Sequence, residues 1–487
     1  MALSNAVLTK LARRFKPASI CLMAALLSGS AVLSGCLSKT PSHAKLLQDA
    51  LPQGTTIPTA WTAASNLDGA VANDWVASFH DPNLNAVVVE AIAHNLDLVQ
   101  AAAMVEVARQ NVVIVASQLK PQIGAGFGAA TTRDKNQDQN FNSNSERMGI
   151  SWEFDIWGRL RAQRAAAQAG FEATSLDYAW ARQSLAATTS LAWYQAVGLR
   201  ALVAVTEEAV KDYQELLRLS KIKLTAGQVS GLDVAEAGAE LDLSQSELSS
   251  FQSLFIAAQR NLELLLGRYP AGAIDISRAF SPLPPPVQAG LPSTLLERRP
   301  DVVAAEHVVL AAFRNLEAAR LARLPTFALT FEGGRIGDPL LSLVNLNPWF
   351  YHTALGMTLP VYTGGRLTAQ VKIETAQQQQ AAAHYGSVVL HAFDEVETAL
   401  TNENLYAQQF QHLESSFQEY SESVRIATIK YKAGAYDMQQ VLQLQTSQLS
   451  VEADVIKARN ARLANRINLH LALGGGFDAA PALQPIH

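Results

Sequence analysis

Residues 149–160 read GISWEFDIWGRL, and residues 356–367 read GMTLPVYTGGRL. The two stretches share their first glycine and their final Gly-Arg-Leu in the same register, at an offset of 207 residues. The same offset relates the Ala-Gly pair at 226–227 to the Ala-Gly pair at 433–434. A constant offset between separate matches indicates a tandem duplication, because chance matches would not keep one spacing.

Each copy contains segments in which apolar and polar residues alternate, within 121–157 and within 325–361. Alternation gives a strand one apolar and one polar face. We expect two strands in each segment, joined by loops at 131–147 and 333–348. Such strands suit an outer-membrane barrel, and a small soluble sheet is the alternative. Four strands cannot close a barrel, and an open edge in lipid leaves backbone groups unpaired, so a membrane sheet requires several chains.

Helical composition dominates the stretches around the predicted strands. Few prolines interrupt them, and they are rich in Ala, Gln, Leu and Glu, which favour helices. Two predicted helices are unusually long, at about 100 Å each. We predict long helices at 158–224 and 364–430, return helices at 231–267 and 438–473, and one further helix before the strands of each copy.

The composition excludes several functional classes. The chain has 487 residues, of which 49% are hydrophobic and 17% are charged, and its net charge is −5. This charge argues against binding of nucleic acid, and the apolar content argues against disorder. Two cysteines cannot build a disulfide framework or a thiolate metal site. The histidines lack metal-ligand spacing and no nucleophile motif occurs, so we expect neither an enzyme nor a cofactor.

The first 35 residues have the organisation of a bacterial lipoprotein signal peptide. A basic segment precedes an apolar run at 18–33, which ends in the lipobox-like sequence Leu33-Ser34-Gly35-Cys36. We therefore expect cleavage before Cys36 and a covalent lipid on its thiol, and a plain signal peptide is the alternative. The apolar run is too short for a membrane span. No later stretch looks like a transmembrane helix, so any membrane span is expected to be β.

Motifs along the whole mature chain resemble the TolC-type outer-membrane factor family, in particular its OprM/NodT-like lipoprotein branch, which serves RND efflux pumps. The resemblance implies a mixed α and β membrane protein. Four strands from each chain would form a trimeric, twelve-stranded barrel, continued by a long α-helical periplasmic barrel with an equatorial belt. The motifs are Asp74-Trp75, Phe79 to Leu84, Asn95 to Leu98, Trp152 to Arg159, Glu297 to Val302, Gly364 to Arg366 and Tyr431 to Gly434.

The resemblance and the repeat together divide the chain into six parts. They are the signal peptide (1–35), an N-terminal periplasmic or equatorial segment (36–82), repeat one (83–267), an equatorial linker (268–292), repeat two (293–473) and a C-terminal tail (474–487).

The resemblance also implies a function and a location. The chain would be a passive exit duct for small molecules such as drugs, docked to a periplasmic adaptor and an RND inner-membrane transporter. It would be a homotrimer in the outer membrane, anchored by lipid and barrel, with a large periplasmic portion. A duct for polypeptide (type I) secretion remains an alternative. So does a structural coiled-coil envelope lipoprotein, although the strand alternation argues against it.

Two matched turns are the candidate adaptor contacts. Their glycines permit a left-handed turn and close backbone approach, and a role in the turn alone is the alternative. The turns are Gly227-Gln228-Val229-Ser230 and Gly434-Ala435-Tyr436-Asp437. Behind them, Glu236 and Gln443 are candidates for a periplasmic constriction. The OprM-like branch carries an aspartate where this chain has Gln443, so a charged or a neutral ring remains open.

Overall fold

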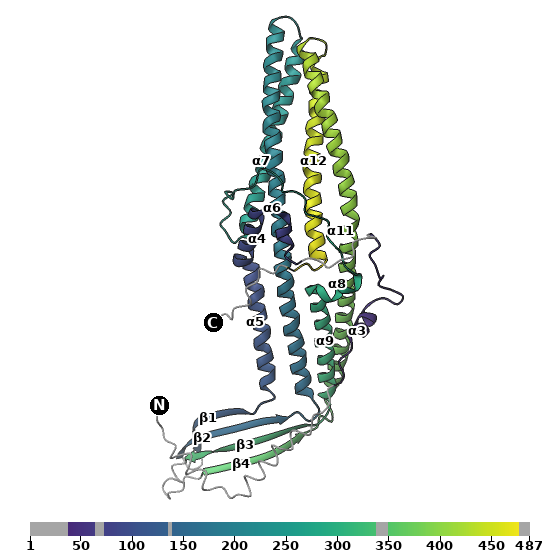
Figure 1. Cartoon of the computed structure of the whole chain (residues 1–487). Helices are drawn as coiled ribbons and strands as arrows, with labels where there is room; N and C mark the ends of the chain where they lie inside the picture. Colours follow the sequence, from purple (N-terminus) through teal and green to yellow (C-terminus); the bar gives the residue numbers. More distant parts are fainter. Residues whose placement is uncertain (1–37, 64–72, 135–138, 338–348, 477–487) are drawn as a thin grey trace. The chain divides into compact units, whose positions relative to one another are not determined.

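The computed structural model describes residues 38–63, 73–134, 139–337 and 349–476 (Figure 1). The chain forms two compact units, and four helices continue from one unit into the other. The first unit comprises 1–50, 107–172 and 306–383, and the second comprises 51–106, 173–305 and 384–487. The elements are α3 (His43–Ala50), η1 (Trp75–Phe79), α4 (Pro82–His94), α5 (Leu96–Ser117), β1 (Gln122–Asp134), β2 (Gln139–Phe154), α6 (Arg159–Thr225), α7 (Gly231–Leu265), α8 (Pro292–Arg298), α9 (Pro300–Leu321), β3 (Thr326–Gly337), β4 (Trp349–Thr358), α11 (Arg366–Lys432) and α12 (Met438–Ala472).

The first unit contains one antiparallel sheet with the strand order β1-β2-β3-β4. The loop predicted at 131–147 is wrong, because β1 continues to Asp134 and β2 begins at Gln139. Polar composition suggested a loop, yet strands are held by backbone hydrogen bonds, which polar side chains do not prevent. The second predicted loop is shorter than expected as well, since β3 reaches Gly337. Residues 338–348 lie outside the described part of the chain.

The long helices have matching lengths in the two halves of the chain. α6 and α11 each contain 67 residues, and α7 and α12 each contain 35. α11 and α12 begin and end 207 residues after α6 and α7, respectively. A helix of 67 residues is about 100 Å long at 1.5 Å per residue. The predicted ends of these four helices differ from the observed ends by at most two residues.

The helix that precedes the strands is broken once in each half. Between α4 and α5, Asn95 accepts a hydrogen bond from the N–H of Leu98 at 3.1 Å and donates to the carbonyl of Leu265 at 3.0 Å. Between α8 and α9, the buried Arg299 pairs with Asp301 at 2.7 Å and Glu395 at 2.5 Å. Each break therefore lets a polar side chain connect the helix start to a neighbouring element.

A large hydrophobic core occupies the second unit around η1, α4 and the middle of α6. Asp81 organises its edge. Its carboxylate accepts the N–H groups of Asn83 and Leu84 at 3.0 and 3.1 Å, which caps α4. The same carboxylate accepts hydrogen bonds from the Trp193 indole at 3.1 Å and the Ser281 hydroxyl at 3.0 Å. The Phe79 to Leu84 motif therefore has a structural role.

Candidate functional site

The two matched turns close the helical hairpins α6–α7 and α11–α12. Gly227 and Gly434 have φ angles of 70° and 78°, so each occupies the left-handed region that other residues rarely adopt. A Cβ added at either glycine would meet no atom within 4 Å. The backbone conformation, and not the available space, therefore requires glycine. This finding supports the turn role and leaves adaptor contact as a prediction.

The last residue of each turn caps the return helix that follows. Ser230 accepts the N–H of Leu232 at 3.2 Å and Asp233 accepts the N–H of Ser230 at 2.8 Å, as in a capping box. At the second turn, Asp437 accepts the N–H of Gln440 at 2.9 Å. Most of the candidate contact residues, including Gln228 and Ala435, are exposed, whereas Val229 and Tyr436 are half-buried.

A lysine connects the two hairpins close to their turns. Lys223 of α6 donates to the carbonyl of Tyr431 on α11 at 2.7 Å, and its ammonium lies 3.6 Å from the centroid of the Tyr431 ring. Burial raises the pKa of the Tyr431 phenol, and the charge of Asp233 raises it further. These residues line a cavity of about 740 Å³, together with Tyr436 and Asp437. Sequence reasoning missed this contact, because nothing in the sequence indicates that Lys223 faces the other hairpin.

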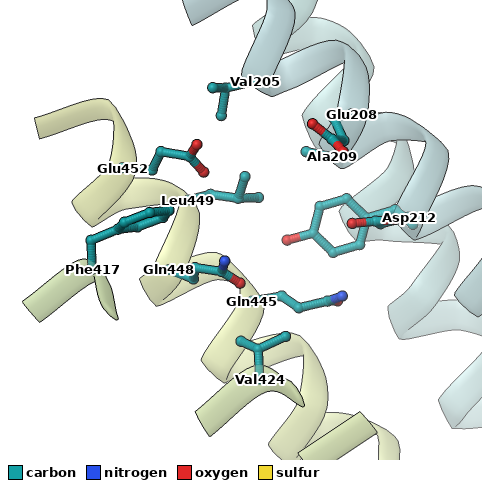
Figure 2. Close-up of a pocket in the computed structure, with 11 residues that line it drawn as sticks. Val205, Glu208, Ala209, Asp212, Phe417, Val424, Gln445, Gln448, Leu449 and Glu452 are labelled. Carbon is teal, nitrogen blue, oxygen red and sulfur yellow. The ribbon is translucent and has the colours of Figure 1, made fainter. Parts of the chain in front are cut away.

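Three carboxylates gather at a second cavity, of about 240 Å³, farther along the hairpins. Figure 2 shows Glu208 and Asp212 of α6 on one side and Glu452 of α12 on the other. Burial raises the pKa of Asp212 and of Glu452, and the charge of Glu208 adds to both shifts. No local sequence pattern indicates that these three carboxylates lie together. Within the described ranges, no set of three or more His, Cys, Asp or Glu residues is arranged to hold a metal ion.

The other predicted site residues have different outcomes. Glu236 is half-buried on α7, and Gln443 is exposed on α12. A constriction formed by these residues would require further copies of the chain around a common symmetry axis, so this role stays a prediction. Cys36 lies outside the described residues, so its lipid also stays a prediction.

One helix of the described chain, α5, is long and apolar enough to cross a membrane, judged by length and composition. The mean hydropathy of its 18-residue window is 1.3, and 11% of that window is buried. The expectation that no later stretch looks like a transmembrane helix is therefore wrong, because the charged residues of α5 are few. Its large apolar side chains are widely exposed, for example Leu96 at 74% and Val107 at 70%.

One face of the sheet is apolar across all four strands. Ile123, Ile150, Phe331 and Thr353 form one continuous row across the strands. A second row contains Trp152, Leu329 and Leu355, and a third contains Phe154, Phe327 and Met357. Leu355 is 70% exposed and Met357 is 62% exposed. A soluble antiparallel sheet packs its apolar face on a core, whereas a barrel strand turns that face to lipid.

The opposite face carries polar and small residues. Gln122, Ser151, Thr330 and Ala354 form a row on this face, beside a row of Gly149, Glu332 and His352. Arg147 also lies on this face and pairs with Glu332 at 3.6 Å. Residues of this kind line the interior of membrane barrels, where water is present.

Charged and aromatic residues mark the loop end of the apolar face. There, Glu146, Arg335 and Trp349 form one row, and Trp349 is 75% exposed. Arg335 lies eight residues after Phe327 on β3. This separation corresponds to about 27 Å along the strand, which a strand tilt of about 40° reduces to about 20 Å, a height that fits within an outer-membrane apolar band of about 25 Å. Aromatic residues at such a boundary are typical of membrane interfaces.

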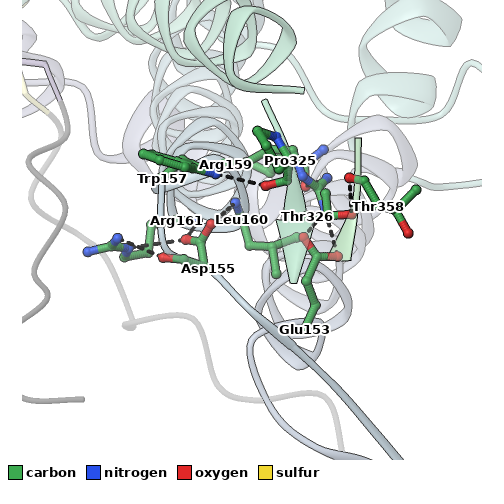
Figure 3. A network of polar contacts seen from close by, with 10 residues as sticks. Glu153, Asp155, Trp157, Arg159, Leu160, Arg161, Pro325, Thr326 and Thr358 are labelled. Carbon is green, nitrogen blue, oxygen red and sulfur yellow. Dashed lines mark hydrogen bonds and ion pairs between the residues drawn. The ribbon is translucent and has the colours of Figure 1, made fainter. Parts of the chain in front are cut away.

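A polar network joins β2 to the start of α6 (Figure 3). Asp155 accepts the N–H groups of Leu160 at 3.0 Å and Arg161 at 2.9 Å, and it also pairs with the Arg161 guanidinium at 3.1 Å. Arg159 donates to both oxygens of Glu153 at 2.8 and 2.9 Å. The Trp157 indole donates to the carbonyl of Pro325 at 2.8 Å, immediately before β3. The Trp152 to Arg159 motif therefore fixes the exit of the chain from the sheet.

Exposed apolar and polar faces, strands of outer-membrane length and long helical hairpins are together typical of outer-membrane channels that continue into helices. The comparisons with known proteins agree. The sequence profile of the outer membrane efflux protein family matches residues 87–268 and 291–475. The chain belongs to this family, and it is therefore an outer-membrane component of an efflux system with a periplasmic portion.

Named relatives and solved structures share nearly the whole length of the chain. The pyoverdine export outer membrane protein OpmQ of Pseudomonas putida is 29% identical over 95% of this chain and 98% of its own. The cation efflux system protein CusC of Escherichia coli is 28% identical over 85% of this chain and 90% of its own. The Campylobacter jejuni CmeC outer membrane channel, at 22% identity, shares the fold with a TM-score of 0.82, over 92% of this chain and 97% of its own.

Proposed function

We propose that three copies of this chain form one duct across the outer membrane. The observation that carries this proposal is the sheet, whose β1 and β4 each have one unpaired edge among the described strands. A sheet with an apolar face toward lipid cannot leave these edges open, because unpaired backbone groups are costly in hydrocarbon. Three sets of four strands give a closed barrel of twelve, which lies within the size range of such barrels.

Exposed apolar side chains outside the barrel face support the same assembly. Val361 and Tyr362, just after β4, are 89% and 90% exposed, and α5 exposes several large apolar residues along its length. Neighbouring copies would cover these surfaces. The equal lengths of α6 and α11, and of α7 and α12, support a tandem duplication. Because each chain contributes these four helices, three chains would give the helical part of the duct twelve helices.

The cargo of the duct is small molecules, and the energy for transport comes from elsewhere. In this proposal the energy is supplied by an RND inner-membrane transporter, to which a periplasmic adaptor connects the chain. The hairpin turns would receive the adaptor. Relatives are named for pyoverdine export, toluene efflux and cation efflux, which are all small cargoes. The small and polar residues on the inner sheet face suit passage of diverse solutes.

A covalent lipid on Cys36 completes the proposal as a second membrane anchor. Its support is the lipobox-like sequence that ends at this cysteine. The mature N-terminus should have the mass of an acylated cysteine, and an unmodified terminus would contradict this part.

The assembly is tested on protein extracted from outer membranes in mild detergent. Native mass spectrometry should give three chains, and the same preparation should conduct ions in planar bilayers. A stable, non-conducting monomer would contradict the duct. The transport role is tested in a strain that lacks the chain, which should become sensitive to toxic small molecules and recover when the gene is restored.

A further inference from the structure

The beginning of the described chain lies against helix α9, within the first unit. The backbone N–H of Ser38 donates to Glu317 at 2.6 Å, and the carbonyl of Ser38 accepts from Arg314 at 2.9 Å. Arg314 also donates to the Thr40 hydroxyl at 2.6 Å. Both backbone groups of one residue are therefore bound by two side chains of the same helix.

The two helical residues are arranged for this role. Arg314 and Glu317 are one turn apart and pair with each other at 2.7 Å, and their side chains are only 12% and 14% exposed. Burial alone would raise the pKa of Glu317, but its hydrogen bonds with Ser38 and Arg314 hold that pKa below its usual range. The planar guanidinium fork reaches two acceptors at once, which a lysine could not do.

Further contacts extend this arrangement along the chain. The Nδ1 atom of His43, the first residue of α3, lies 2.6 Å from the Glu306 carboxylate. Glu306 belongs to the same helix α9, so this is a further polar contact between the two segments. Leu46 of α3 is buried. The segment from Ser38 onward is therefore attached to α9 at several points and does not rest on a single bond.

We infer that Arg314 and Glu317 form a seat for the start of the mature chain, which holds the lipid-bearing Cys36 beside the strand end of α9. The inference rests on the proposed lipidation. Cys36 precedes Ser38 by two residues, which span at most about 7 Å. Glu317 in turn precedes Thr326, the first residue of β3, by nine residues.

The seat would keep the two membrane anchors together. The apolar sheet face sets one depth in the bilayer, and the acyl chains of Cys36 must enter the nearby leaflet. A tether of two residues leaves the lipid little freedom once Ser38 is bound. The function of the seat is therefore to fix where the lipid enters the membrane relative to the barrel.

Trypsin tests the seat on the purified full chain, because Lys39 is exposed between Ser38 and Thr40. Proteases need an extended, detached segment, so cleavage after Lys39 should be slow in the native protein. Arg314→Ala should accelerate release of the acylated fragment 36–39 by about tenfold or more, since two hydrogen bonds to a charged group are lost. Arg314→Lys should give a smaller increase. Arg320→Ala, an exposed arginine on the same helix, should behave like the parent chain.

Two further measurements distinguish protection by the seat from protection by the lipid. The mass of the released fragment reports lipidation directly, so a missing lipid is recognised independently of the cleavage rate. In a second chain, a cleavable leader without a lipobox replaces residues 1–36, and Lys39 should stay protected because the seat is polar. Loss of protection in this unlipidated chain would show that the membrane or the micelle shields Lys39, and would overturn the seat. Equal cleavage of Arg314→Ala and the parent chain would overturn it as well.

Discussion

The two strand-to-helix junctions occupy equivalent places in the two halves of the chain but are built differently. In the first half, Asp155 caps α6 and pairs with Arg161, and its side chain is 8% exposed. The residue 207 positions later is Tyr362, which is 90% exposed. Its neighbour Val361, three residues after the end of β4, is 89% exposed. One junction is completed by its own side chains, whereas the other exposes apolar groups.

The difference indicates how a duplicated unit acquires two roles. The first junction connects β2 to α6. Because β2 is paired on both sides within its own chain, this junction has to be stable without contacts from another copy. The second follows β4, which has an open edge. In the proposed trimer this edge pairs with another copy of the chain, and the exposed side chains of Val361 and Tyr362 become part of the interface between the copies. The predictions below change one half of the chain and, except for the test of the trimer, use the other half as the reference.

The largest effect is expected from Val361→Asp. Burial of a valine contributes roughly 1.5 to 3 kcal/mol, and a carboxylate in the same place would have to lose its water. Because every trimer contains three such contacts, we expect native mass spectrometry to show mainly monomers. Thr358→Asp, on the polar face of the sheet at the end of β4, should still give trimers. Intact trimers of Val361→Asp would place the interface elsewhere.

A smaller loss is expected from Asp155→Ala. This change removes a helix cap and leaves Arg161 without its carboxylate, so the first junction should lose about 2 to 3 kcal/mol of stability. Circular dichroism during denaturation should show a lower unfolding midpoint. Tyr362→Ala, at the equivalent position of the second half, should leave the unfolding of the chain itself unchanged. If both variants unfold alike, the two junctions are not specialised in the way described.

At the hairpin turns, Lys223 and Lys430 are also 207 residues apart. Lys223 contacts the other hairpin, whereas Lys430 lies 4.6 Å from the Tyr436 ring of its own hairpin. We expect Lys223→Met to weaken the contact by about 1 to 2 kcal/mol. Hydrogen exchange should then accelerate in both turns. Lys430→Met should affect the second turn alone, and identical exchange in the two variants would contradict the bridging role of Lys223.

Much of the architecture was predictable from the sequence because it depends on period and spacing. The long helices and the alternating strands follow from such patterns, and the repeat offset places their ends. The break at Asn95 was missed because an asparagine that caps the next helix looks like any polar helix residue. The strand content of 131–147 was missed because polar side chains hide a regular backbone pairing.

Contacts between distant segments were the least predictable part of the candidate site. Lys223 and Tyr431 are far apart in sequence, and so are Arg314 and Ser38. Each pair joins two elements whose relative rotation decides the contact, and a single sequence does not encode that rotation in a local pattern. The turn glycines were found because a left-handed turn has a local signature. Tryptophan or a charged residue at Gly434 would disturb the turn itself, so Ala435→Trp is the better test of adaptor docking.

The smallest effect concerns the carboxylate cluster, in which α6 of the first half supplies two of the three carboxylates and α12 of the second half supplies Glu452. Glu208 and Asp212 of α6 correspond to Ser415 and Glu419 of α11 at the offset of 207, and Glu419 is exposed. Burial and the charge of Glu208 raise the pKa values of Asp212 and Glu452 in the folded chain. The folded state therefore binds more protons than the unfolded state just above the ordinary carboxyl range.

Stability should consequently fall as the pH rises through these raised pKa values, and it should recover as the pH is lowered into the ordinary carboxyl range. Glu208→Gln removes the like charge at the cavity, so the unfolding midpoint should depend less on pH. The change should remain below about 1 kcal/mol, because the cavity is open to solvent and screens the charges. Glu419→Gln, on the exposed face of the second half, should keep the pH dependence of the parent chain. If the unfolding midpoint depends on pH equally in Glu208→Gln and in the parent chain, the charge of Glu208 does not contribute to the raised pKa values of Asp212 and Glu452.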